Sequence, residues 1–431
     1  MGITLYDVAY LAATPAAASY IAYKAWRQGK YQESIPAMLG RSIDQEDPAM
    51  WRDGSVWVHA VSVGEVMAAK AMLPLLRKEF PQWPILLTTH TETGQAEAKR
   101  MQGGMADAVR YFPFDYSWTV RRFADVYKPR LFIPMETELW PNVLNLFAER
   151  GASIFVLNCK ISERSFRSYS RIRPLLHGPL SRVAAFCVQT AEDGDRVRSL
   201  TKGMRPVHVT GNCKFDTPIA DFSDAEAAQL RQAFGISEGQ PVVVVGSTHP
   251  GEEQIILDAW KYVHSAVPGT VMLLAPRHPE RFDAVWNLLC ASGFRVRRAS
   301  TGQTCGEPPA SLVLVDQMGI LAKLYALSNV AIIAGSFVQG IGGHNLQEAA
   351  GHGVPVIHGP YMRKQPDMVR ILTAEAGGTM AEDSHMLAEQ TIALLKDPEL
   401  ARDKGSRGRD AFQRNRGSSQ RNIEIIRRYF K

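Results

Sequence analysis

The sequence predicts an α/β protein with two doubly wound domains, each built around a parallel sheet. From residue 55 onward, short apolar runs rich in β-branched residues alternate with helical patterns, and this alternation indicates βαβ units. The runs form two series, and residues 216–224 between them hold a proline and several acids, which is typical of a linker. The 431 residues exceed what one core holds and suit two domains of roughly 150–200 residues each.

The strands are predicted from these apolar runs. In the first series we expect strands at 56–60, 85–89, 131–135, 154–158, 186–190 and 208–210. In the second series we expect them at 242–247, 271–275, 312–315, 330–334 and 354–357. Open parallel sheets bind ligands at the carboxyl ends of their strands, so functional residues are sought in the loops that follow these runs.

The N-terminal segment lies outside both strand series. Residues 8–23 are almost uncharged and are followed by Lys24, Trp26 and Arg27. This pattern favours an uncleaved membrane anchor over residues 1–31, with the following domain on the cytoplasmic side. The stretch is shorter than the ~20 residues that a span needs, so a packed alanine-rich helix is the alternative.

The remaining boundaries follow from the linker and the tail. We expect a first domain at 32–217, a second domain at 218–403 and a closing segment at 404–431. The tail ends in a periodic apolar run, which predicts a closing helix with one apolar stripe. The run consists of Ile423, Ile425, Ile426 and Tyr429.

Charge and cysteine content bear on partners and compartment. The formal charge of +6 and the pI near 9.0 favour acidic partners, which include nucleic acid, phosphorylated substrates and anionic membranes. The cysteines are odd in number, widely separated and without a C-x-x-C pair. We therefore expect neither a disulfide framework nor a structural zinc site. The pattern fits a protein of a reducing compartment best. They are Cys159, Cys187, Cys213, Cys290 and Cys305.

Glu65 follows the first predicted strand and has two interpretations. Ser62 and Glu65 have the spacing of a capping box, in which both side chains satisfy free N–H groups at a helix start. The alternative is a catalytic carboxylate at the carboxyl end of a strand. Glu136 and Glu138 directly follow the strand at 131–135, and two acids there favour the catalytic interpretation over a helix N-terminal acid pair.

Polar and basic residues follow two further strands of the first series. Lys160 and Arg164 lie in the stretch 158–165, and Lys214 lies in the stretch 211–216. Each alone is weak evidence, because basic side chains usually occupy solvated surfaces. Together they predict a cationic rim that fits an acidic acceptor.

A glycine-rich stretch, 335–345, follows the strand that ends at 334 and precedes a helix. Its glycines and the free N–H groups of the helix start predict an anion-binding loop. A dinucleotide site would place an acid at the end of the next strand, and none is there. Glu348 lies instead one turn into the helix, where a carboxylate can bind a ribose diol or complement the helix dipole. The loop residues expected to support the phosphate are Ser336, Gly342, Gly343 and His344.

The turn at 276–281 follows the strand at 271–275 and carries two arginines, a histidine and two prolines. Guanidinium groups are natural partners of phosphate, and the turn lies at the end of the strand where ligands bind. An ordinary charged surface loop is the alternative. We interpret the turn as a phosphate contact.

The motifs VSVGE, TTHTETG, METELWPN, ISERS, VTGNCKFD, PRHPER and GGHN, in this order, resemble those of the Kdo transferases of lipopolysaccharide synthesis. These enzymes transfer 3-deoxy-D-manno-octulosonic acid (Kdo) from CMP-Kdo to a lipid A precursor. The resemblance covers nearly the whole chain. It implies a GT-B fold, two Rossmann-like domains facing each other across a cleft, and an inverting transfer that uses neither a metal nor a cofactor.

The resemblance also implies residue roles. Glu65 falls on the family's general base, Glu136 on its supporting acid and Lys214 on the lysine of the NxKFD motif. The implied contacts to the CMP donor fall on Pro276, Arg277, Met318, Gly319, Ile320, Asn345, Leu346, Gln347 and Glu348.

Four positions depart from the family pattern. Ile320 stands where the DxMGEL stretch has an acid, so a donor contact there would come from the backbone. Leu346 and Ala349 replace the two prolines of HNPLEPA, and Glu92 stands where proline is frequent. These changes leave the role implied for Glu65 intact.

The partners implied by the resemblance are the CMP-Kdo donor, a phosphorylated tetraacyl lipid A precursor (lipid IVA) as acceptor, and the inner membrane at its cytoplasmic face. No nucleic acid partner is expected. Two alternatives stay open: another GT-B sugar-nucleotide enzyme, such as a UDP-sugar transferase or epimerase, and a non-catalytic member of the family.

Overall fold

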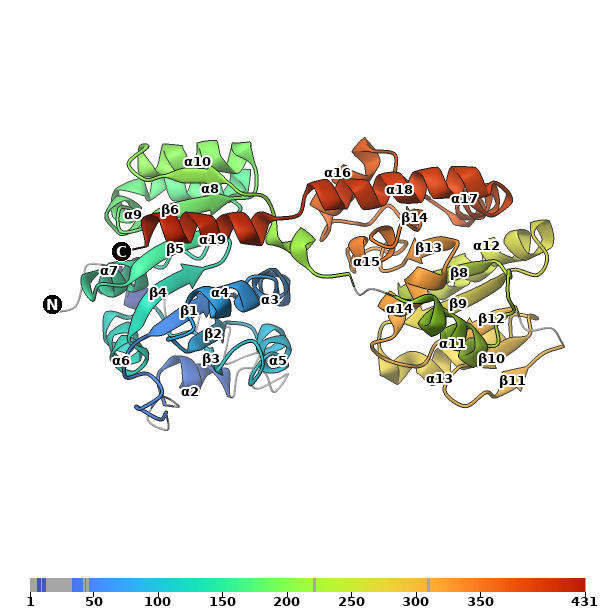
Figure 1. Cartoon of the computed structure of the whole chain (residues 1–431), viewed down its shortest axis with the longest axis horizontal. Helices are drawn as coiled ribbons and strands as arrows, with labels where there is room; N and C mark the ends of the chain where they lie inside the picture. The colour runs from blue at the N-terminus through green and yellow to red at the C-terminus, as the bar shows by residue number, and fades with distance from the viewer. Residues whose placement is uncertain are drawn as a thin grey trace. The chain divides into compact units, whose positions relative to one another are not determined.

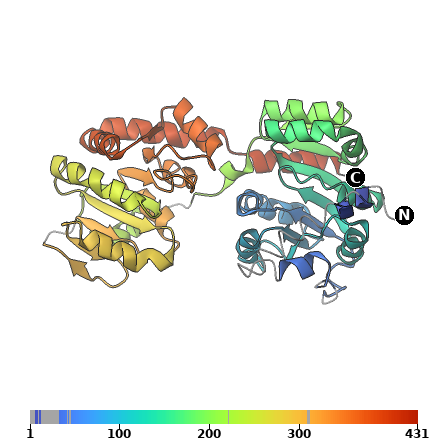
Figure 2. The ribbon, with the colours of Figure 1, turned by 180° about the vertical axis from the view of Figure 1, so that it is seen from behind.

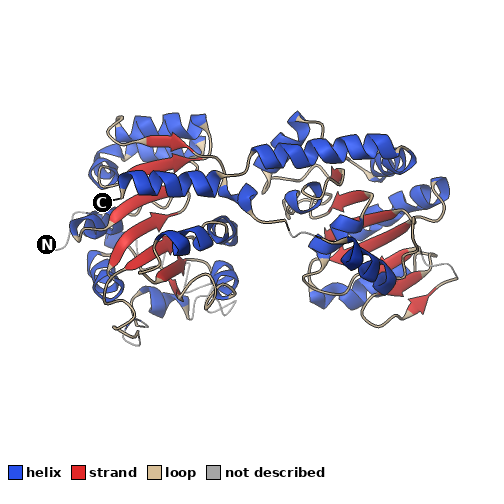
Figure 3. Cartoon of the chain, viewed as in Figure 1, coloured by secondary structure: helices blue, strands red, loops and turns tan. Residues whose placement is uncertain are grey.

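The computed structural model describes residues 6–8, 10–12, 33–41, 43, 46–219, 222–307 and 311–430. The chain forms two compact units (Figure 1). Unit 1 comprises Met1–Pro218 and Asn415–Lys431, and unit 2 comprises Ile219–Arg414. In each unit, helices flank a sheet on both faces (Figure 3). The doubly wound α/β class predicted from the sequence is thereby confirmed.

Unit 1 contains a parallel sheet of seven described strands in the order β3-β2-β1-β4-β5-β6-β7. Its strands are β1 (Ser55–His59), β2 (Ile85–Thr89), β3 (Ala108–Tyr111), β4 (Pro129–Pro134), β5 (Ser153–Cys159), β6 (Ala185–Val188) and β7 (Val207–Val209). Its helices are α2 (Ser34–Met38), α3 (Val63–Lys70), α4 (Leu73–Glu79), α5 (Glu92–Lys99), α6 (Ser117–Tyr127), α7 (Pro141–Glu149), α8 (Glu163–Arg171), α9 (Arg173–Leu180), α10 (Ala191–Thr201), η2 (Cys213–Asp216) and α19 (Ser418–Tyr429).

Both faces of this sheet are buried, which explains the continuous apolar runs in the sequence. Along β1, Trp57 points into an aromatic core that contains Phe132, and its indole N–H donates to Thr88 Oγ1 at 2.8 Å. Val56 and Val58 point to the opposite face and a second apolar core. The alternation follows from the two-residue repeat of a strand.

Unit 2 contains a sheet of eight described strands in the order β11-β10-β12-β9-β8-β13-β14-β15, parallel except for the pairing of β10 with β11. Its strands are β8 (Val242–Thr248), β9 (Val271–Pro276), β10 (Val296–Arg298), β11 (Thr304–Cys305), β12 (Leu312–Leu314), β13 (Val330–Ile333), β14 (Val356–His358) and β15 (Gly378–Met380). Its helices are α11 (Asp224–Phe234), α12 (Glu252–Ala266), η3 (Pro279–Arg281), α13 (Phe282–Cys290), α14 (Leu321–Leu327), α15 (Gln347–Ala350), α16 (Pro366–Ala374), α17 (Ser384–Lys396) and α18 (Pro398–Arg414).

Every strand predicted from the sequence is present, with shifts of a few residues at the ends. The strands that the sequence did not reveal are β3, β10, β11 and β15. Three of them are edge strands and β10 is next to an edge. Their side chains are partly exposed, so they lack the continuous apolar runs of central strands.

The C-terminal segment 404–431 contains the end of α18 and all of α19 instead of one closing helix. The break lies at Gly417, whose φ of 87° is left-handed. Helix α19 returns to unit 1, the unit that also contains α2 near the start of the chain (Figure 2). The Asp216 carboxylate, in the predicted linker region, accepts from the N–H groups of Gly417 and Ser419 and thereby caps α19.

The apolar stripe predicted for the tail is confirmed in α19. Ile423 and Ile426 are buried in the same core as Val56 and Val58 of β1. Ile425 and Tyr429 are partly buried against it. The helix is therefore a packing element of unit 1.

The expectation that the cysteines form no disulfide is wrong for one pair. Cys290 at the end of α13 is bonded to Cys305 in β11, with their Cα atoms 5.8 Å apart. The β10–β11 pairing turns the chain back and brings Cys305 beside α13, a proximity that a spacing of 15 residues does not reveal. Cys159, Cys187 and Cys213 are free and buried.

Most of the predicted membrane anchor, residues 1–31, lies outside the described residues. Within the part that is described, Asp7 is buried in unit 1 and accepts from the N–H of Ser117 at 2.9 Å and from Asn142 Nδ2 at 2.8 Å. In the ranges that the structure describes, no helix is both long enough and apolar enough to cross a membrane.

Candidate active site

Glu65 lies in the first turn of α3, directly after the carboxyl end of β1. Its side chain is buried, with 7% of its surface exposed. Oε2 accepts from the Val61 N–H at 2.8 Å, and Oε1 accepts from the Ser62 hydroxyl at 3.0 Å. These bonds fix the carboxylate over the loop that joins β1 to α3.

The capping box predicted from Ser62 and Glu65 is absent. Ser62 is the N-cap residue of α3, but its side chain makes no cap hydrogen bond and donates to Glu65 instead. The Glu65 carboxylate binds the N–H of Val61, one residue before the position that a capping box requires. The sequence spacing was right for a box, and the local backbone directs the serine toward the carboxylate.

The loop that carries Glu65 is braced by the TTHTETG stretch. The Val61 carbonyl accepts from the N–H groups of His90 and Thr91, at 3.3 and 3.1 Å, and from the Thr91 hydroxyl at 3.1 Å. Gly94 is required here, because a Cβ atom would lie 3.0 Å from the Val61 oxygen and 2.9 Å from Thr91 Oγ1. This brace holds the Glu65 carboxylate independently of any ligand.

Glu136 and Lys214 come together at the same edge of the unit 1 sheet. Glu136 follows β4, the neighbour of β1, and Lys214 lies in η2 after β7. Lys214 Nζ binds Glu136 Oε1 at 3.2 Å. The same ammonium lies 3.5 Å from where a Cβ atom on Gly64 would be, beside Glu65. The three residues predicted to be catalytic therefore form one cluster.

The backbone around this cluster is constrained. Glu136 has a φ of 54°, and Asn158 at the end of β5 has the same value. Left-handed non-glycine residues are uncommon and concentrate at functional sites. Asn158 Oδ1 accepts from the Cys213 N–H at 2.9 Å, and Asn212 Oδ1 accepts from the Lys214 N–H at 3.0 Å. Sequence reasoning assigned no role to either asparagine, yet together they position Lys214.

The electrostatics of the cluster raise the pKa of Glu65 to about 7. Burial is the largest cause, the negative charge of Glu136 is the next, and the hydrogen bond from Val61 opposes both. Glu138 has a similarly raised pKa of about 7, also chiefly from burial, and its Oε2 accepts from Trp140 Nε1 at 2.8 Å. Glu138, which the sequence already placed beside Glu136 directly after β4, is thus a third acid at this sheet edge.

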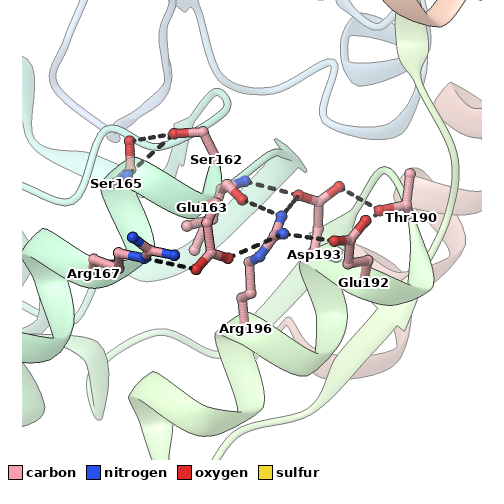
Figure 4. Close-up of polar contacts among 9 residues, drawn as sticks. Ser162, Glu163, Ser165, Arg167, Thr190, Glu192, Asp193 and Arg196 are labelled. Carbon is pink, nitrogen blue, oxygen red and sulfur yellow. Dashed lines mark hydrogen bonds and ion pairs between the residues drawn. The ribbon is translucent and has the colours of Figure 1, made fainter.

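The ISERS stretch is mainly structural (Figure 4). Ser162 caps α8 by accepting from the Ser165 N–H at 3.1 Å. Glu163 forms ion pairs with Arg167 at 2.9 Å and Arg196 at 3.5 Å, and Arg196 also binds the Ile161 carbonyl at 2.7 Å. Arg167 and Arg196 are not among the basic residues expected at the rim, and of those residues Lys214 is paired with Glu136.

The glycine-rich loop of unit 2 is closed by a buried carboxylate that sequence reasoning missed. Glu252 at the start of α12 has no exposed surface. Its oxygens accept from four backbone N–H groups at 2.7–2.9 Å, those of His249, Gly335, Ser336 and Phe337. The N–H groups at 335–337 are therefore engaged within the protein, and the buried Ser336 hydroxyl donates to the Ile333 carbonyl at 2.6 Å and accepts from the Gly359 N–H at 2.8 Å.

The other loop residues have distinct positions. The helix after the loop, α15, begins at Gln347, later than the loop glycines. Gly342 and Gly343 have φ values of 96° and 81°, and a Cβ on Gly343 would lie 2.2 Å from Met362 Sδ, so both require glycine. His344 lies against the ring of His249, a residue after β8 that the sequence reading did not select.

The residues expected to contact the donor lie at the carboxyl ends of the unit 2 strands. Asn345 Nδ2 donates to Glu348 Oε1 at 3.2 Å. Burial raises the pKa of Glu348, and this increase is partly offset by the hydrogen bond from Asn345 and by the positive charge of Arg277. Leu346 and Gln347 are buried, so a donor contact at these two positions would come from the backbone.

The two remaining donor stretches are more open. Arg277 follows Pro276, the last residue of β9, and is exposed. Met318 is 58% exposed, Gly319 has a left-handed φ of 81°, and Ile320 is the N-cap residue of α14. These positions present backbone and charged groups at the sheet edge where ligands bind.

Comparison with known proteins identifies the family. The sequence profile of 3-deoxy-D-manno-octulosonic-acid transferase (Kdo transferase) matches residues 27–217. The chain is 32% identical over 379 residues to the 3-deoxy-D-manno-octulosonic acid transferase of Haemophilus influenzae, covering 87% of each chain. The chain belongs to the Kdo transferase family. A second Kdo transferase, from Bordetella pertussis, is 31% identical over 415 residues, or 93% of this chain and 94% of that protein.

Membership of the Kdo transferase family makes this chain a glycosyltransferase of lipopolysaccharide synthesis, as the motifs implied. The fold agrees. The UDP-GlcNAc 2-epimerase of Neisseria meningitidis superposes with a TM-score of 0.58 at 14% identity, covering 87% of this chain and all of that one. Each unit is thus a Rossmann-like domain of the GT-B type.

Proposed function

We propose that this Kdo transferase moves Kdo from CMP-Kdo to a hydroxyl of a phosphorylated lipid A precursor, with inversion at the anomeric carbon. The observation that carries the proposal is the cluster of Glu65, Glu136 and Lys214 at one edge of the unit 1 sheet, in a chain of this family. A buried acid at such an edge is suited to take the proton from an acceptor hydroxyl.

In this proposal Glu65 is the general base. Its two hydrogen bonds orient the carboxylate, and a pKa of about 7 gives it basicity matched to neutral pH. Glu136, held by Lys214, contributes negative charge beside Glu65 and favours the positive charge that develops on the sugar. The acceptor hydroxyl attacks the anomeric carbon, its proton passes to Glu65, and CMP leaves with the bonding electron pair.

The donor is assigned to unit 2. The cytidine ribose is proposed to bind Glu348, which Asn345 orients, and the phosphate to bind Arg277. The backbone at Met318, Gly319 and Ile320 and the residues Pro276, Leu346 and Gln347 complete the proposed contacts. CMP carries a single phosphate, so fewer countercharges are needed than for a diphosphate donor.

The acceptor is proposed to be lipid IVA, met at the cytoplasmic face of the inner membrane. Exposed basic residues of unit 1, Arg164 among them, are available for its phosphates. The segment 1–31 is proposed to hold the enzyme in the plane where a lipid-linked acceptor lies.

The direct test incubates the purified chain with lipid IVA and either CMP-Kdo or a UDP-sugar, and measures the product by mass spectrometry. We expect a mass increase of one or more Kdo units with CMP-Kdo and none with the UDP-sugar. CMP, but not UDP, should inhibit. Inhibition by UDP alone would indicate a different sugar-nucleotide enzyme, and nucleotide binding without any product would indicate a non-catalytic member.

The pH dependence of transfer should follow Glu65. A base must be ionised, so kcat/KM should rise with pH through about 7, the raised pKa of Glu65. Glu136→Gln removes the largest like charge and should move this rise to lower pH, besides slowing transfer. Glu138→Gln should move it less, because its charge contributes less to the raised pKa. If kcat/KM of Glu136→Gln rose with pH at the same place as in the parent, the charge of Glu136 would not be raising the pKa of Glu65.

Arg277→Gln should weaken CMP binding by about 10–100-fold, because a charge-assisted hydrogen bond contributes about 1.5–3 kcal/mol. Arg407→Gln is the matched control, since Arg407 pairs with Asp403 on the exposed side of α18. Calorimetric titration of both variants with CMP and with cytidine gives the comparison. Cytidine should bind Arg277→Gln and the parent equally, and unequal binding would move Arg277 away from the phosphate.

A further inference from the structure

Three histidines gather at the carboxyl end of the unit 2 sheet. His249 follows β8, His278 follows β9 and His344 lies in the loop after β13, and these three strands are neighbours. The rings of His249 and His344 lie within 6° of parallel, and their Nε2 atoms are 2.9 Å apart. The His278 ring meets His249 edge-on, with centroids 5.4 Å apart.

The contact between His249 and His344 limits how many protons the two rings can carry. Two nitrogens at 2.9 Å share one hydrogen, so one ring donates and the other accepts. One further proton fits without breaking the contact, because an imidazolium can still donate to a neutral imidazole. A second would set two N–H groups head to head. Starting from two neutral rings, the pair can therefore take up one additional proton.

The surroundings keep this proton off while the site holds no anion. Burial lowers the pKa of both rings, and nearby cations lower it further. These cations are Arg277, Arg281 and Lys364. The opposing carboxylate, Glu253, is bound to Arg281 at 2.7 Å, and Glu252 is saturated by four N–H groups. Arg277 and Lys364 are both exposed and can meet an anion, while Glu280 lies 3.9 Å from His278 on the same turn.

We propose that the His249–His344 pair is a proton-linked part of the phosphate site, which takes up one proton from solvent when the phosphate of the donor binds. The inference rests on the proposed donor site in unit 2, and it says which residues make donor binding depend on pH. An anion near the rings reverses the effect of the surrounding cations and favours the imidazolium. Donor affinity then rises as pH falls, by up to about tenfold per pH unit for one linked proton.

The test counts protons by calorimetry in buffers of different ionisation enthalpy. CMP itself titrates near pH ~6, so the ligand is cytidine 5′-methyl phosphate, a phosphodiester without such a proton. At pH ~6.5 we expect uptake that approaches but does not exceed one proton per chain. Cytidine, which lacks the phosphate, should bind with no uptake, and free Kdo, which offers a carboxylate, should cause none.

Variants locate the proton. His249→Asn and His344→Asn should each abolish the uptake and flatten the pH dependence of binding, while His385→Asn on the exposed surface of α17 should leave both unchanged. If either variant fails to fold, the histidine ring NMR titration of the parent chain with and without the ester decides. Binding of the ester without uptake, or uptake with free Kdo, overturns this inference alone. Failure of every cytidine ligand to bind overturns the proposed donor site as well.

Discussion

Glu65→Gln should reduce transfer by about 10²–10⁴-fold while the fold and CMP binding persist. The glutamine keeps the size of the side chain, and its one oxygen can still accept from the Val61 N–H while its NH₂ group donates to the Ser62 hydroxyl oxygen. It cannot take a proton near neutral pH, so loss of activity reports loss of the base. Initial rates with saturating CMP-Kdo and lipid IVA give the measurement.

Glu138→Gln is the matched control for this variant. Glu138 is in the same cluster and its pKa is raised to about 7, so a pH profile alone does not separate it from Glu65. Its carboxylate accepts a hydrogen bond from Trp140 Nε1, and a glutamine oxygen can accept the same bond. We expect at most a modest loss in Glu138→Gln. A larger loss there than in Glu65→Gln would transfer the role of base to Glu138.

The central strands could be predicted because they are buried on both faces, whereas the edge strands β3, β11 and β15 were missed and only the edge strand β7 was predicted. Strands such as β1 and β8 read as unbroken apolar runs, whereas β15 has side chains that are only half-buried or exposed. The disulfide between Cys290 and Cys305 depends on β11, an edge strand of two residues, so missing that strand also meant missing the bond.

The site residues that could be predicted are those whose chemistry is visible in the residue itself. Glu65 and Glu136 are acids directly after strands, and the topology brings them together because β1 and β4 are neighbours. Asn158 and Glu252 escaped notice because their importance lies in the backbone groups they bind, and those groups are far away in sequence. A polar residue gives no sign in the sequence of which distant N–H it will meet.

Glu252→Gln should be among the most destabilising single substitutions in unit 2. A carboxylate satisfies four N–H groups with two acceptor oxygens, whereas glutamine turns an NH₂ group toward two of them. Each buried N–H left without an acceptor costs about 1–3 kcal/mol. With two such groups, we expect the free energy of unfolding to fall by about 2–6 kcal/mol. Glu389→Gln, on the exposed side of α17, is the matched control.

Hydrogen exchange measured on the full chain separates a local from a general effect of Glu252→Gln. The amides of Gly335, Ser336 and Phe337 should exchange faster, whereas those of unit 1 strands should keep their protection. CMP binding should weaken with the loop, because the same carboxylate ties His249 to the segment that leads to His344 and Asn345. Unchanged exchange at 335–337 would mean that the loop holds its shape without the carboxylate. The glycine-rich segment would then be rigid through its own backbone, and Glu252 would be a consequence of that shape instead of its cause.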